Sequence, residues 1–180
     1  MQKDLFGNPI KKRRTRLEIQ LSKHDRETFE DRLERLKYLD SVIPKNYWMA
    51  GSFESTFLFQ EAGAAFINGA FISSVMLAQA FIERRLQDYM EARGLGKEAR
   101  RGLDFIIKYF RKNRIMDEFL LRKIDVLRQK RNPFSHLKPY DHPYTMSQRI
   151  FLERKQPDQI LLSDAKEAVS LMYKISLIQL

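Results

Sequence analysis

Cysteine is absent from the 180-residue sequence. This absence excludes disulfide bonds, thiolate metal ligands and cysteine nucleophiles, and it is typical of proteins from a reducing compartment. No apolar run approaches the roughly 18–20 residues that a membrane-spanning helix requires. The residues after Met1 are Gln-Lys-Asp, and no apolar core of a signal peptide follows them. We therefore expect a cytoplasmic protein with no membrane partner.

Acidic residues are scarce relative to basic ones. The chain has 33 Lys and Arg against 23 Asp and Glu, a formal net charge of +10. Such an excess favours a polyanionic partner, and nucleic acid is the best candidate. The alternative is a soluble basic protein whose charge serves no binding function.

Hydrophobic side chains are abundant enough to build a core. They make up 43% of the sequence and include 13 Phe. A chain of this length buries about 70% of its unfolded surface, so it needs no metal or disulfide for stability. No segment alternates apolar and polar residues in the manner of a strand. The sequence predicts an all-α protein, an antiparallel helical bundle.

The N-terminal segment looks different from the rest. We expect residues 1–21 to form an extended basic arm and residues 22–180 to form one helical domain. The arm contains a basic run that could bind an RNA backbone or remain a solvated tail: Lys11, Lys12, Arg13, Arg14 and Arg16. The segment Gln2–Phe6 resembles the bacterial sliding-clamp peptide, which makes that clamp a further candidate partner.

Apolar spacing and turn residues predict the helices. The first begins at Ser22, which is followed by Asp25 in the manner of a capping box. A helical hairpin follows, with its turn at Asn68–Gly69. The predicted helices that follow the one beginning at Ser22 span residues 54–67, 70–93, 97–111, 115–131, 147–155 and 164–179. The buried face of the 115–131 helix is predicted to be Met116, Phe119, Leu120, Ile124 and Leu127.

The segment from Leu127 to His136 carries the chemistry. Arg131 presents a planar fork that grips a phosphate through two hydrogen bonds. His136 can take or give a proton near neutral pH. Pro133, which lies between them, removes a helical hydrogen bond, so both side chains are predicted to flank a distorted helix end.

This segment resembles the R-x4-H motif of the HEPN family (higher eukaryotes and prokaryotes nucleotide-binding domains), with Arg131, Asn132 and His136 in the motif positions. The stretch from Phe57 to Glu83 resembles the long helical hairpin of that family. The segment 163–168 is similar to the helix that packs behind the motif. The resemblance covers residues 54–180 and leaves residues 1–53 unaccounted for.

The resemblance implies a helical bundle that dimerises so that two motifs meet in one cleft. Many members are metal-independent ribonucleases with toxin, phage-defence or RNA-processing roles. Others are inactive modules that bind RNA, nucleotide or a partner protein. In one toxin subgroup an antitoxin modifies a tyrosine two positions after the histidine, and here that position is Lys138. A cognate antitoxin is a further candidate partner. Because Lys138 replaces the tyrosine, we do not expect an antitoxin to regulate this chain by that modification.

The expected site is accordingly Arg131 and His136 as catalytic residues, with no cofactor and no metal. Asn132 either supports His136 or is an ordinary turn residue before Pro133. Glu83 either pairs with Arg131, which we favour as a structural ion pair, or faces solvent. Three functions stay open: a homodimeric endoribonuclease, an inactive HEPN-like module, and a DNA-associated factor tethered through its arm.

Overall fold

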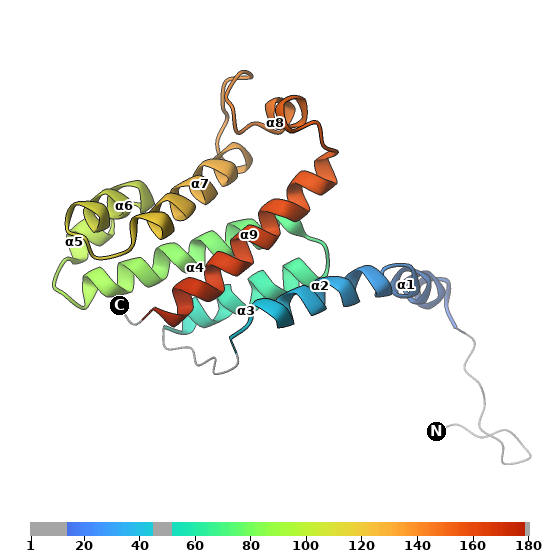
Figure 1. Ribbon diagram of the computed structural model, residues 1–180. Coiled ribbons are helices and arrows are strands. Elements are labelled where there is room, and N and C mark those ends of the chain that lie inside the picture. Colours follow the sequence, from blue (N-terminus) through green and yellow to red (C-terminus); the bar gives the residue numbers. More distant parts are fainter. Residues whose placement is uncertain (1–13, 45–51, 179–180) are drawn as a thin grey trace, which may run out of the picture.

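A computed structural model of the protein describes residues 14–44 and 52–178, and all regular structure in these two ranges is helical (Figure 1). The helices are α1 (Arg16–Glu27), α2 (Phe29–Val42), α3 (Phe53–Ile67), α4 (Phe71–Glu91), α5 (Gly96–Ala99), α6 (Leu103–Lys112), α7 (Glu118–Ser135), α8 (Met146–Glu153) and α9 (Pro157–Leu177). The all-α prediction is confirmed.

Helix α4 is the centre of the bundle. It packs along α3 and α9, and its other sides contact α5, α6 and α7. The predicted turn between α3 and α4 is confirmed, with Asn68 as the C-cap of α3 and Gly69 at a φ of 79°. That conformation is easy for glycine because it lacks a Cβ. The largest fully buried side chains are Phe66, Phe81, Phe110, Ile82, Leu86, Met90, Ile106, Leu121, Ile124, Ile160, Met172 and Ile175.

The N-terminal helix starts earlier than predicted. Thr15, not Ser22, is the N-cap: Thr15 Oγ1 accepts from Glu18 N at 3.2 Å, and Thr15 N donates to Glu18 Oε2 at 2.6 Å. This reciprocal capping box lets the helix begin at Arg16, so residues 16–21, which we expected within an extended arm, are helical. Helix α1 buries none of its residues and extends away from the bundle (Figure 1).

Two other predicted helices have the wrong limits. The segment 97–111 is interrupted at Gly102, whose φ of 83° ends one helix before α6 begins. The last helix starts at Pro157, seven residues before the predicted start at 164, because proline at the first helical position costs no hydrogen bond. Asp164, which we expected as a cap, consequently lies inside α9.

Helix α7 positions the predicted motif. Its N-cap is Asp117, whose carboxylate accepts from Leu120 N at 3.1 Å. Ile124 and Leu127 are buried as predicted, whereas Phe119 is 61% exposed and Leu121 is buried instead. The helix also continues through Pro133 to Ser135. A proline this close to the end interrupts only the last turn, so the predicted end at residue 131 is wrong.

A buried ionic cluster joins the three C-terminal helices. The Asp164 carboxylate of α9 accepts from both Nη atoms of Arg149 in α8, with Nη2–Oδ1 at 2.9 Å, and from Lys130 Nζ of α7, also at 2.9 Å. The side chain of Asp164 is only 2% exposed. Hydrogen bonds to Glu167 and Asp164 raise the pKa of Lys130, although burial opposes them. These bonds fix the end of α7 relative to α8 and α9.

We predict that Asp164→Asn lowers the free energy of unfolding by about 3–5 kcal/mol, because it removes the one buried carboxylate that Arg149 and Lys130 share. The two cations then keep only more exposed partners, Glu153 at 2.9 Å and Glu167 at 2.7 Å. Urea denaturation followed by circular dichroism measures the change. The matched control is Asp40→Asn, an exposed site in α2, which should change stability by less than about 0.5 kcal/mol. Equal effects of the two substitutions would contradict a structural role for the cluster.

Candidate functional site

The end of α7 carries three of the predicted site residues, Arg131, Asn132 and His136. Arg131, Asn132 and Pro133 are half-buried and helical, and His136 follows as the C-cap with an extended φ of −140°. The His136 backbone N–H donates to the Asn132 carbonyl at 2.9 Å. This is the last backbone hydrogen bond of the helix and does not involve the Asn132 side chain, and the imidazole side chain of His136 is exposed to solvent.

Arg131 lies on the side of α7 where Glu83 of α4 is found. Burial raises the pKa of Glu83, while the positive charge of Arg131 and a backbone hydrogen bond from Leu103 lower it by less. The two side chains interact electrostatically but form no direct ion pair. Arg131 Nε is buried and has no hydrogen-bond partner among the described residues. Gln79 Oε1 and Arg85 Nε of α4 are buried without a partner in the same way, and a buried polar atom of this kind requires an explanation such as a bound water, an ion or a ligand.

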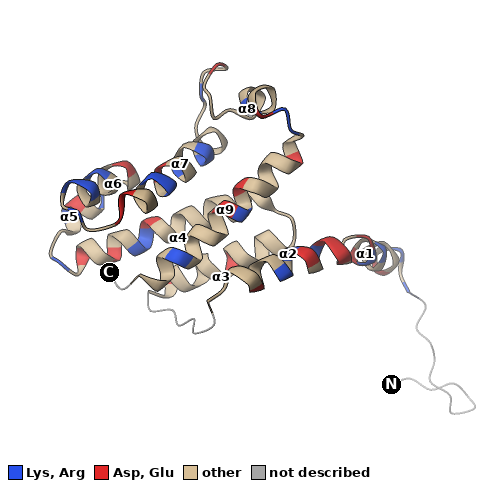
Figure 2. Cartoon of the chain, viewed as in Figure 1, with Lys and Arg blue, Asp and Glu red and all other residues tan. Residues whose placement is uncertain are grey.

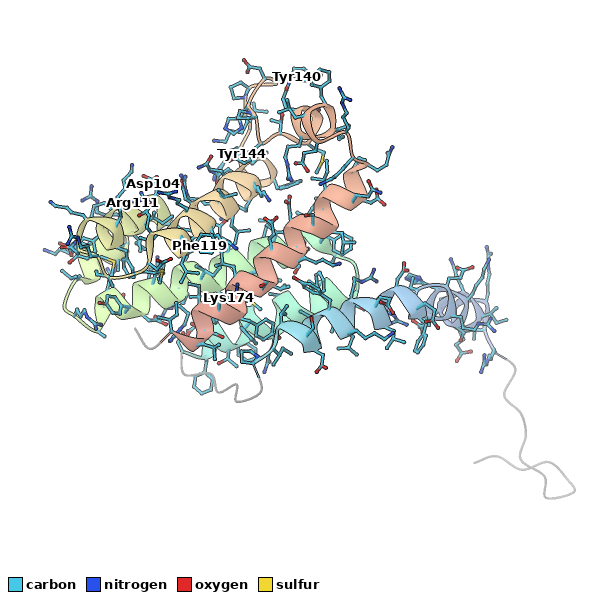
Figure 3. The ribbon with its side chains drawn as sticks, in the orientation of Figure 1. Asp104, Arg111, Phe119, Tyr140, Tyr144 and Lys174 are labelled. Carbon is cyan, nitrogen blue, oxygen red and sulfur yellow. The ribbon has the colours of Figure 1, made fainter. Side chains whose placement is uncertain are left out.

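The loop after His136 is exposed and leads to α8. His142 shapes this loop: its backbone N–H donates to Pro139 O at 3.0 Å, and its Nδ1 accepts from Tyr144 N at 3.3 Å. Leu137 is fully exposed and Tyr140 is 78% exposed. Figure 3 shows Tyr140 at the outer part of the loop and Tyr144 nearer the end of α7.

The structure brings some of the predicted residues together and separates others. The end of α7 carries Arg131, Asn132 and His136, and Glu83 of α4 lies near Arg131. No hydrogen bond or ion pair joins Arg131 to His136 within the described chain. The two described residues of the predicted basic run, Arg14 and Arg16, are not part of this site. Arg14 is exposed, Arg16 is the first residue of α1, and α1 lies away from α7 (Figure 1). Lys11, Lys12, Arg13 and the Gln2–Phe6 segment lie outside the described residues.

Sequence reasoning missed the ionic cluster that supports the motif. Lys130 immediately precedes Arg131, and its bonds to Asp164 and to Glu167, at 2.9 and 2.7 Å, hold the motif helix against α9. A signal was available in the sequence: Asp164 lies at helical spacing between Ile160 and Ala168, which are both buried. A carboxylate inside an apolar stripe needs a buried cationic partner.

The described residues contain neither a metal-binding cluster nor a membrane-spanning helix. No group of three or more His, Asp or Glu side chains in ranges 14–44 and 52–178 is arranged to hold a metal ion. None of the helices in those ranges is both long and apolar enough to cross a membrane.

Comparison with known proteins yields no relative: no family model, curated protein or solved structure matches the chain.

We predict that Glu83→Gln raises the melting temperature at neutral pH. Burial raises the folded-state pKa of Glu83, so the folded protein favours the protonated carboxyl and is destabilised when Glu83 ionises. The wild type recovers this stability as the pH falls through the raised pKa. Thermal unfolding between pH 4 and pH 8 should therefore show a gain from Glu83→Gln that shrinks toward acid pH.

Glu61→Gln is the matched control for that experiment, because Glu61 is exposed on α3. It should show no such pH-dependent gain. A Glu83→Gln protein that melts below the wild type at neutral pH would mean that attraction to Arg131 outweighs the cost of burial.

Proposed function

We propose that the protein is a metal-independent endoribonuclease in which Arg131 and His136 act on RNA. The observation that carries the proposal is the arrangement at the end of α7. The half-buried Arg131, whose Nε has no hydrogen-bond partner among the described residues, is followed by the exposed His136 at the C-cap. The resemblance of this segment to the R-x4-H motif of HEPN ribonucleases supports the same reading.

The chemistry requires a base, an acid and a positive charge. A base removes the proton of the RNA 2′-hydroxyl, and the resulting oxygen attacks the adjacent phosphorus. The bond from phosphorus to the 5′-oxygen breaks, an acid protonates that oxygen, and a 2′,3′-cyclic phosphate remains. Histidine serves either proton transfer near neutral pH. Arginine stabilises the charge that develops on the phosphate oxygens.

One chain supplies one His136, whereas the reaction needs two proton-transfer groups. We propose that two chains pair about a two-fold axis so that both motifs face one cleft. Exposed apolar side chains in the loop after the motif and in α8 support this pairing. Leu137 in the loop, and Phe151 and Leu152 of α8, are 100%, 77% and 64% exposed. A partner chain that covers such side chains removes their apolar surface from water.

His136→Ala is expected to lower RNA cleavage by roughly 10²–10⁴-fold, the usual loss for a general acid–base group. Arg131→Lys should also impair turnover, because lysine lacks the bidentate fork. Cleavage of single-stranded RNA, followed on denaturing gels in the presence of chelator, measures both. Because His136 is exposed, its removal should leave the helical circular-dichroism signal unchanged.

His24→Ala is the matched control, since His24 is exposed in α1, and it should cleave at the wild-type rate. Unfolding of His136→Ala would assign His136 a structural role. A wild type that binds RNA but never cuts it would favour an inactive binding module. Loss of wild-type activity on chelation would contradict the metal-independent mechanism.

A further inference from the structure

One region of the described chain is strongly basic. Residues 93–114 contain eight Lys and Arg against two Asp and Glu, a local net charge of +6. They cover the turn after α4, the whole of α5 and α6, and the start of the turn before α7 (Figure 2). We call this region the basic corner; its cationic residues are Arg93, Lys97, Arg100, Arg101, Lys108, Arg111, Lys112 and Arg114.

All eight of these side chains are exposed, and few of them are neutralised. Only two pair with carboxylates: Lys108 with Asp104 and Arg111 with Glu118, at 2.7 and 2.9 Å. Arg93 and Arg101 lie over the rings of Tyr89 and Phe105, with guanidinium carbons 3.5 and 3.8 Å from the ring centroids. The remaining four form no ion pair within the described ranges: Lys97, Arg100, Lys112 and Arg114.

The geometry of α6 explains why these charges face outward. Its buried face is formed by Leu103, Ile106, Ile107 and Phe110. The opposite face carries Asp104, Lys108, Arg111 and Lys112 at a spacing of about one helical turn. The apolar face packs on the bundle, so the cations form a row directed into solvent; Figure 3 labels Asp104 and Arg111 on this helix.

The basic corner begins beside the motif helix. Burial raises the pKa of Glu83, and the positive charge of Arg131 and the backbone of Leu103, the first residue of α6, both lower it. Arg131 and the start of α6 therefore both lie close to this carboxylate. A second contact joins α6 to the motif helix: Arg128 Nη2 of α7 lies 3.3 Å from Asp104 Oδ1 of α6. The row of cations therefore runs from the neighbourhood of Arg131 along α6.

We infer that the basic corner binds the phosphodiester backbone of single-stranded RNA and guides it to the motif; this inference rests on the proposed ribonuclease function. The surface fits RNA better than a protein partner because no large hydrophobic side chain between residues 93 and 114 is among the exposed ones. Protein interfaces need an apolar centre, whereas backbone binding needs accessible cations.

The test uses Lys97→Gln, Arg100→Gln, Lys112→Gln and Arg114→Gln combined, because these four side chains form no ion pair whose loss would disturb the fold. The substitutions are made in His136→Ala protein so that RNA survives the assay. Fluorescence anisotropy with a labelled oligoribonucleotide, over a salt series, gives affinity and salt dependence. We expect affinity to fall by about 10–100-fold, and the slope of log K against log salt to flatten by about 0.7 per lost contact.

The matched control changes four exposed cations elsewhere, Lys23, Arg26, Lys37 and Lys155, each to Gln. An equal loss in the control would mean that net charge alone drives binding and would overturn the inference. Unchanged RNA binding by the basic-corner variant, with cleavage intact in the parent enzyme, would overturn the inference and leave the proposed function standing. A wild type that neither binds nor cuts RNA would overturn both.

Binding to an acidic protein is distinguished from binding to RNA by repeating the titrations of the wild type and the basic-corner variant with poly-L-glutamate in place of RNA. Loss of poly-L-glutamate binding with retained RNA binding would assign the basic corner to an acidic protein and contradict the inference.

Discussion

Asp164 is a buried carboxylate in the middle of an apolar helix face, and the C-terminal part of the protein is arranged around it. Its two oxygens bind Arg149 of α8 and Lys130 of α7. Removing a charge from water is expensive, and these pairs offset that cost only if α7, α8 and α9 keep one relative position. The free-energy cost of burying Asp164 therefore restricts α7, α8 and α9 to the relative positions in which these pairs form. Since Arg131 directly follows Lys130, the same constraint fixes where the guanidinium of Arg131 lies.

The end of α7 places Arg131 and His136 in different environments. Arg131 remains inside the last turns of α7, close to Glu83 and with an unsatisfied Nε. Beyond Pro133 the helix ends, and the extended backbone of His136 carries the imidazole into solvent. In the function that we propose, the cation binds a phosphate group and the solvent-facing imidazole transfers a proton. In the further inference, the row of cations on α6 leads the polyanion to this place.

Much of the fold follows from local sequence signals. The Asn68–Gly69 turn and the apolar periodicity of α4 and α9 depend on neighbouring residues, and the structure agrees with them. For α7 the structure agrees at Ile124 and Leu127 but not at Phe119, which is exposed. The limits of α1 and α9 were not predicted, because Thr15 and Pro157 each offered a cap that competed with the expected one. For the site, Arg131 and His136 could be proposed from spacing. Their support by Asp164 and the proximity of Glu83 depend on contacts across 15 or more residues, which periodicity does not reveal.

The central claim is that two chains combine their motifs into one RNA-cleaving cleft. It is tested most directly by measuring cleavage rate per chain and mass, by light scattering, in the same dilution series. Our account predicts particles of twice 21.5 kDa at high concentration, and a rate per chain that falls in step with the dimer fraction on dilution. A constant rate per chain in samples that scatter as 21.5 kDa monomers would contradict it.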